Sequence, residues 1–155
     1  MAGARRSALA AAGLTVVLVA AGCGGGRLSH KDFVKKADAV CSAYRSQTPP
    51  LVSPRSYDAV VAWGRKMLPL YAAALDTLRA LQPPQADEQA VHNWLAADER
   101  VQGATRDLVV AAQKRDYPSL SAAASRAQLA GSESRQAATA IGLQVCGTFV
   151  AASGR

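Results

Sequence analysis

The sequence predicts an all-α protein, an antiparallel up-down four-helix bundle with a kinked second helix. Alanine makes up about a fifth of the 155 residues and aromatic residues only 5%, while clusters of strand-forming side chains are missing; this composition favours helix. Apolar residues recur at spacings of three and four in four segments, which prolines and other helix breakers separate. Short turns between helices of this length predict antiparallel neighbours.

The first helix is predicted to begin near Ser29, because Asp32 follows at the spacing of a capping box. Its apolar face comprises Phe33, Val34, Ala37, Val40, Cys41 and Tyr44. We therefore expect Cys41 to point inward. The polar residues that fall outside this face are Lys31, Lys35, Asp38 and Arg45. The helix should stop before Pro49 and Pro50, since a residue that precedes proline is pushed out of helical geometry.

The second helix is expected to start at Ser53-Pro54 or at Ser56-Tyr57, because serine caps helices and proline suits the first helical position. Its apolar stripe is Tyr57, Val60, Val61, Gly64, Met67, Leu68, Tyr71, Leu75 and Leu78. Pro69 lies inside this pattern, lacks an N–H and crowds the carbonyl four residues earlier, which predicts a kink. The kink either opens a pocket or fits a curved bundle, and we favour the second interpretation.

The third helix follows Pro83-Pro84, where Asp87 and Glu88 suit the positive end of a helix. Its apolar face comprises Val91, Trp94, Leu95, Val101, Thr105, Leu108, Val109 and Ala112. Asp98 falls on or beside this face. A carboxylate there would be partly buried, so it needs an arginine or a water as a partner.

The fourth helix follows a break at Asp116–Ser119. Its apolar face is made of small residues and a few larger ones, namely Leu120, Ala124, Ala127, Gly131, Ala138 and Ile141. We expect a close approach of another helix to this face. Gly142 is placed as the C-terminal cap. The segment that follows, with Leu143, Val145, Cys146 and Phe149, is predicted to fold back on the bundle.

The N-terminal segment has the features of an export signal. Arg5 and Arg6 precede an uncharged stretch from Ser7 to Gly22, which ends in small residues. This stretch is too short and too diluted by polar residues to be favoured as a permanent transmembrane helix. Its end, Ala20-Ala21-Gly22-Cys23, resembles the bacterial lipobox. Residues 1–22 are therefore predicted to be a lipoprotein signal peptide.

The resemblance implies that Cys23 becomes the first residue and carries lipid, with palmitate among its acyl chains. Two or more acyl chains satisfy the requirement for stable anchoring. An ordinary secretory signal would instead leave Cys23 as an odd free thiol. Residues 23–28 then form the lipidated Cys and a Gly-rich tether, and residues 29–150 form one helical domain. The expected location is the cell membrane, facing the extracytoplasmic side.

Cys41 and Cys146 remain as an even pair in an exported protein and are predicted to form a disulfide. The bridge would attach the first helix to the end of the last. A redox or metal-binding role is the alternative, but neither cysteine has a C-x-x-C partner or a histidine nearby in sequence. We favour the structural interpretation.

Several segments together are similar to the small helical lipoproteins of actinobacteria, which are largely uncharacterised. The matching segments are the lipobox, residues 31–41 from Lys-Asp-Phe to Ala-Val-Cys, Leu81-Gln82-Pro83-Pro84, and Gly142-Leu143-Gln144-Val145-Cys146-Gly147. The resemblance implies a helical extracytoplasmic domain with paired cysteines. It implies no activity.

Loss of the signal peptide removes two of the 18 basic residues, so 16 remain against 11 acidic ones, a net charge of +5. This charge would suit anionic lipid headgroups or acidic wall polymers, and nucleic acid is not expected outside the membrane. Solubility alone explains the same charge. The basic residues are scattered along the chain and form no patch that identifies a partner.

The sequence points to no enzyme, metal or cofactor. His30 and His92 are its two histidines, and neither has a second ligand at helical spacing. Phosphate-binding loops and nucleophile-elbow motifs are also missing. A catalytic pair would have to come from His92 and Asp98 meeting in a cleft.

The expected function is a structural or protein-interaction module of the cell envelope, monomeric and with an unidentified envelope protein as its partner. The alternative is a carrier of a small apolar, lipid-like ligand. Its candidate pocket residues are Tyr57, Pro69, Tyr71 and Trp94, with Trp63 nearby. If Trp63 and Trp94 were exposed on one face, they would instead mark a docking surface.

Overall fold

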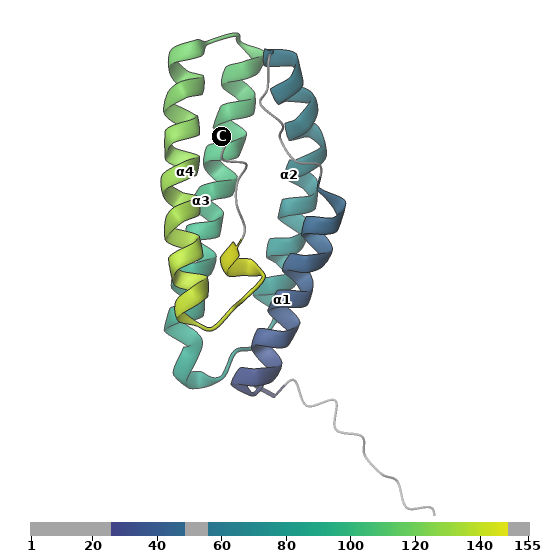
Figure 1. Ribbon diagram of the computed structural model, residues 1–155, viewed down its shortest axis with the longest axis vertical. Helices are drawn as coiled ribbons and strands as arrows, with labels where there is room; N and C mark the ends of the chain where they lie inside the picture. Colours follow the sequence, from purple (N-terminus) through teal and green to yellow (C-terminus); the bar gives the residue numbers. More distant parts are fainter. Residues whose placement is uncertain (1–25, 49–55, 149–155) are drawn as a thin grey trace, which may run out of the picture.

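The computed structural model describes residues 26–48 and 56–148, and every regular element in these ranges is helical (Figure 1). The long helices are α1 (His30–Gln47), α2 (Tyr57–Ala80), α3 (Glu88–Gln113) and α4 (Tyr117–Ala140). Single 3-10 turns, η1 (Gln85–Asp87) and η2 (Cys146–Thr148), precede α3 and follow α4. The predicted all-α class and helical bundle are confirmed. The predicted signal peptide and Cys23 lie outside the described residues.

Local hydrogen bonds set the first residues of three helices, because a side-chain oxygen accepts a bond from a backbone N–H three residues later. These bonds join Ser29 to Asp32 at 3.2 Å, Ser56 to Ala59 at 3.2 Å and Asp116 to Ser119 at 3.1 Å. The start near Ser29 is therefore confirmed. Of the two starts offered for the second helix, the structure has the one at Ser56.

A glycine brings α2 against α3. A Cβ added at Gly64 would overlap Cγ2 of Val109, a buried residue of α3. The two backbones can approach here only because the α2 residue has no side chain. Pro69 lies farther along α2, inside the helix and with an exposed side chain.

α3 and α4 lie side by side over most of their length (Figure 1). The buried face of α4 is formed by small residues, namely Ala123, Ala130, Gly131, Ser134 and Ala138. Ion pairs join the two helices, with Arg100 2.7 Å from Glu133 and Arg126 3.0 Å from Asp107. The fourth helix packs closely on α3 through small residues, as predicted, but the buried face is rotated from the predicted one. Within α4, Gly131 and Ala138 of the predicted face are buried, whereas Leu120, Ala124 and Ala127 are only half-buried.

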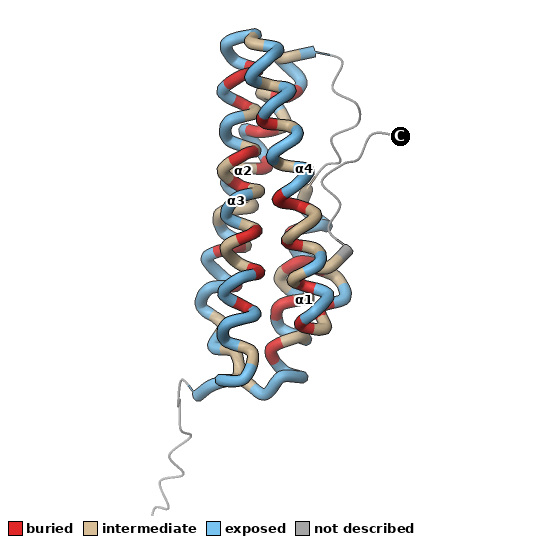
Figure 2. Tube along the Cα trace, turned by 90° about the vertical axis from the view of Figure 1, so that its left-hand side faces the viewer, coloured by how far each residue is buried: buried red, intermediate tan, exposed pale blue. Residues whose placement is uncertain are grey.

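The second half of α3 differs from the predicted apolar face. Val101 and Leu108 are only half-buried, whereas Gln102 and Ala104 are buried. The reason is that α3 packs against both α2 and α4. Its buried surface is therefore wider than one stripe, and Figure 2 shows buried positions on the facing sides of the helices.

The chain turns back at the end of α4. Gly142 has φ 88°, a left-handed conformation that glycine adopts at little cost, and its N–H donates to the Thr139 carbonyl at 2.9 Å. The Leu143 N–H donates to the Ala138 carbonyl at 3.0 Å. The predicted C-terminal cap is confirmed, and the following residues lead to η2, which contacts both α1 and α4.

A hydrophobic core cluster surrounds this returning segment. Its members are Phe33, Ala37, Cys41, Leu78, Val91, Trp94, Ala138, Ile141, Leu143 and Cys146. They come from all four helices and from the segment after α4. The core therefore holds the N-terminal helix and the C-terminal segment together at one end of the bundle.

Candidate functional site

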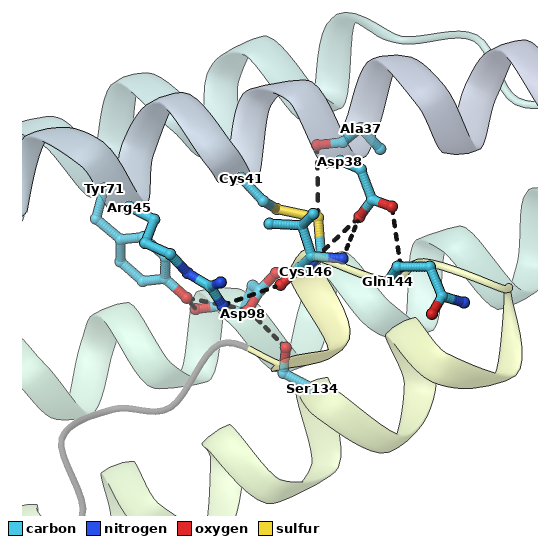
Figure 3. Close-up of a disulfide and its surroundings, with 10 residues drawn as sticks. Ala37, Asp38, Cys41, Arg45, Tyr71, Asp98, Ser134, Gln144 and Cys146 are labelled. Atoms are coloured by element: carbon cyan, nitrogen blue, oxygen red, sulfur yellow. Dashed lines mark hydrogen bonds between the residues drawn. A yellow bond between two sulfur atoms is a disulfide. The ribbon is translucent and has the colours of Figure 1, made fainter.

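The predicted disulfide is present and joins α1 to η2. Cys41 and Cys146 have Cα atoms 5.4 Å apart and are separated by 105 residues in sequence. Both residues are buried. Figure 3 shows two polar networks next to Cys146, one centred on Asp38 and the other on Asp98.

Asp38 holds the segment after α4 through three consecutive backbone N–H groups. Its Oδ2 accepts from Gln144 at 2.9 Å, and its Oδ1 accepts from Val145 at 2.8 Å and from Cys146 at 3.1 Å (Figure 3). The helical pattern predicts Asp38 on the polar side of the first helix. In the structure the Asp38 side chain is not fully solvated, because its carboxylate binds the segment after α4.

Asp98 of α3 lies between α2 and α4. Its Oδ1 accepts hydrogen bonds from the Tyr71 hydroxyl at 3.0 Å and from the Ser134 hydroxyl at 2.7 Å (Figure 3). The sequence indicated a partly buried carboxylate that needs an arginine or a water. The partners that the structure shows are two hydroxyl groups from the neighbouring helices.

Burial controls the electrostatics of this cluster. Loss of hydration raises the pKa of Asp98 above its ordinary value, although the hydrogen bonds from Ser134 and Tyr71 oppose the rise. Burial, together with the nearby Asp98 carboxylate, also raises the pKa of Tyr71 and of Tyr44. Both phenols therefore keep their protons at neutral pH.

A small cavity adjoins the Asp98 cluster and the disulfide. Its lining residues are Cys41, Tyr44, Tyr71, Ala74, Leu75, Leu78, Asp98 and Cys146. The volume open to a water-sized probe is about 20 Å³, which is enough for one water molecule and too little for a lipid-like ligand. The cavity therefore has room for a water molecule next to Asp98 but not for an organic substrate.

The four candidate pocket residues do not all meet at this cavity. Tyr71 lines it, whereas Trp94 is only 1% exposed and belongs to the core around the disulfide. Pro69 is exposed on α2, and Tyr57 lies half-buried at the first turn of α2. Trp63 is half-buried, so the two tryptophans do not form an exposed face.

A larger and more open hollow lies between α1 and α2. Its volume is about 230 Å³, and its lining residues are Val40, Ala43, Tyr44, Gln47, Leu70, Ala73, Ala74 and Thr77. Most of these side chains are apolar. The hollow therefore offers an apolar surface, although it is shallower than the enclosed pockets that typically bind small ligands.

The histidines lie apart from the Asp98 cluster. His92 is exposed on α3, and His30 contacts Asp87 at 2.6 Å. In residues 26–48 and 56–148, no group of three or more His, Cys, Asp or Glu side chains is placed to hold a metal ion. Within the same described part of the chain, no helix is long and apolar enough to cross a membrane.

No family model, curated protein or solved structure matches this chain.

Sequence reasoning missed the roles of Asp38 and Ser134. Asp38 precedes Cys41 by three residues, a spacing that places both on one side of α1 and is visible in the sequence. Ser134 had no such signal. Its buried position depends on Asp98, which lies 36 residues earlier in the chain.

Proposed function

We propose that this chain is an exported lipoprotein, anchored through Cys23, whose helical domain serves as a structural or protein-interaction module on the extracytoplasmic side of the cell membrane. The observation that carries the proposal is the disulfide between Cys41 and Cys146. Disulfides persist in oxidising compartments outside the cytoplasm. Since the chain has three cysteines, this pairing leaves Cys23 as the odd one, and lipidation gives that thiol a role.

Three large apolar side chains are exposed among the described residues, and the positions of two of them support an interaction role; the third, Leu129, lies farther along α4. Tyr117 is 67% exposed and Val110 45% exposed, and both lie close to the turn between α3 and α4. In Figure 1 this turn is at the opposite end of the bundle from the start of α1, which follows the proposed anchor. A partner would therefore meet these residues on the side away from the membrane.

The experiment for the anchor compares the wild type with Cys23→Ala in an actinobacterial host. Wild-type protein should fractionate with membranes and incorporate labelled palmitate, whereas Cys23→Ala should do neither and should appear in the soluble fraction. Cys146→Ser is the matched control, because it removes a different cysteine and should keep the label. Membrane retention of labelled Cys23→Ala would contradict the proposal.

For the topology, we propose an antiparallel up-down order of the helices with a bend at Pro69. The register of α3 and α4 supports this order: Arg100 pairs with Glu133 and Asp107 pairs with Arg126, so residue numbers rise on one helix as they fall on the other. Pro69 supports a bend, since it cannot donate to the carbonyl of Arg65.

The alternative is a carrier of a small apolar ligand, and the apolar hollow between α1 and α2 is the observation that favours it. Native mass spectrometry of residues 24–155, isolated gently from the host envelope, separates the two functions. A species with additional mass that persists through purification supports the carrier. An oxidised protein without additional mass supports the interaction module.

A further inference from the structure

The contacts of Asp38 form a compact anion-binding arrangement. Three successive N–H groups, from Gln144, Val145 and Cys146, converge on one carboxylate at 2.8 to 3.1 Å. Successive backbone N–H groups that point to one side create such a site for an anion, and hydrogen bonds to a charged acceptor are stronger than those to a neutral one. Asp38 supplies the anion from α1, more than 100 residues earlier in the chain.

The same turn of α1 carries one partner of the disulfide. Asp38 and Cys41 are three residues apart on α1, and Cys146 is both the third residue held by Asp38 and the second partner of the bridge. Sγ of Cys146 also lies 3.5 Å from the carbonyl oxygen of Ala37. In the reduced chain this sulfur carries a hydrogen that it can donate to that carbonyl.

These contacts do not depend on the bond between the two sulfur atoms. The Asp38 carboxylate and the Ala37 carbonyl can hold Cys146 against α1 whether Cys146 is a thiol or part of a disulfide. The buried Leu143, in the same segment, adds an apolar contact with the core. Noncovalent contacts alone can therefore hold the segment against α1.

We infer that Asp38 is a positioning residue for oxidation, which docks residues 144–146 on α1 and brings the Cys41 and Cys146 thiols together before the disulfide forms. The oxidant is a small-molecule or protein disulfide. One cysteine thiolate attacks it and releases one thiolate, and the second cysteine then attacks the mixed disulfide and releases the other. Two electrons pass to the oxidant, and the two protons of the cysteines end on its released thiolates.

The test measures the effective concentration of the two thiols in residues 24–155. Wild type, Asp38→Ala and Asp38→Asn are equilibrated with mixtures of reduced and oxidised glutathione, and the fraction of bridged protein is determined after acid trapping. We expect Asp38→Ala to lower the effective concentration by at least about tenfold, because it removes three charge-assisted hydrogen bonds. The effective concentration in Asp38→Asn should lie between those of the wild type and Asp38→Ala, since the amide oxygen of asparagine can still accept hydrogen bonds.

Asp58→Asn is the matched control, because this aspartate is exposed on α2, away from the disulfide. Its effective concentration should equal that of the wild type. If reduced Asp38→Ala is unfolded by circular dichroism, Asp38→Asn alone decides the result. If the folded Asp38 variants have the same effective concentration of the two thiols as the wild type, the inference is overturned.

Amide hydrogen exchange separates positioning from general stability. In the folded dithiol wild type, the amides of Gln144, Val145 and Cys146 should be protected, and Asp38→Ala should expose these three while amides within α3 stay protected. A merely stabilising role would lower protection throughout the bundle. Unprotected amides at residues 144–146 in the dithiol wild type would also overturn the inference.

Discussion

The fold opposes the ionisation of the Asp98 carboxyl group. Its carboxylate is largely removed from water, and the hydroxyls of Tyr71 and Ser134 replace part of the lost hydration. Because burial outweighs these bonds, the pKa of Asp98 is raised in the folded protein. The folded state therefore binds the proton of Asp98 more tightly than the unfolded state does.

This difference predicts a pH dependence of stability. Above the unfolded pKa of Asp98, about 3.9, the folded state holds more protons, so the stabilising contribution of this group is lost as pH rises through its raised folded pKa. Asp98→Asn removes the titration. The wild type should lose stability relative to Asp98→Asn as the pH rises above about 4, as measured by urea unfolding at several pH values.

Asp107→Asn provides the comparison for that series, because Asp107 is exposed and pairs with Arg126 on the surface. The difference in the free energy of unfolding between Asp107→Asn and the wild type should not follow the pH dependence expected for Asp98→Asn. Parallel stability curves for the wild type and Asp98→Asn would contradict the assignment of the pH dependence to Asp98.

Gly64 predicts a second effect at the scale of one residue. Gly64→Ala would drive a methyl group into Val109, so we expect a loss of about 1–3 kcal/mol in the free energy of unfolding. Gly103→Ala is the matched control. An added Cβ there has no neighbour within 4 Å, and alanine should raise stability by up to about 1 kcal/mol. Urea unfolding of both variants measures the difference, and equal effects would contradict the close approach of α2 and α3.

At the scale of elements, α1 and the C-terminal segment depend on each other. α1 contacts α2 and η2, and η2 in turn contacts α4. The disulfide and Asp38 both lie where α1 meets this segment. Two different interactions, one covalent and one electrostatic, therefore attach the first helix to the end of the last.

The disulfide should contribute measurably to stability. It spans a sequence separation of 105 residues, and removal of a native bridge typically costs about 2–5 kcal/mol. Reduction should therefore lower the melting temperature of the wild type in thermal unfolding followed by circular dichroism. The variant with both Cys41→Ser and Cys146→Ser should already melt at a lower temperature and should not respond to reductant. An unchanged wild-type melting temperature would contradict a stabilising role for the bridge.

At the scale of the whole molecule, the two ends of the bundle differ. α1 starts at one end, while the turn between α3 and α4, with Val110 and Tyr117 beside it, lies at the other (Figure 1). If the chain is anchored at Cys23, the proposed function requires the second end to face outward. The exposed apolar side chains would then be available to an envelope protein.

Photo-crosslinking in cells tests this orientation. A photoreactive phenylalanine derivative at Tyr117 should form an adduct with a discrete protein in the membrane-anchored wild type. The same derivative at Lys35, an exposed position near the start of α1, is the control and should not give that adduct. Equal yields of one adduct from both positions would contradict a partner bound at the far end.

The four helices and most of their ends can be predicted from the sequence, because capping depends on residues only a few positions apart. Ser29 and Gly142 lie at helix ends as predicted, whereas α4 begins at Tyr117, inside the break predicted over Asp116–Ser119. Cys41 and Cys146 form the predicted bridge. The helical composition and periodicity likewise reflect local preferences, which act before any long-range contact is made.

The partners of the polar residues inside the bundle depend on the tertiary structure. Asp38 meets N–H groups more than 100 residues away, and Asp98 meets hydroxyls from α2 and α4. Gln102 is buried because α3 packs on two sides. The physical reason is that a polar group can be buried where a partner replaces its hydration, and that partner is brought near by packing of distant segments rather than by neighbours in sequence.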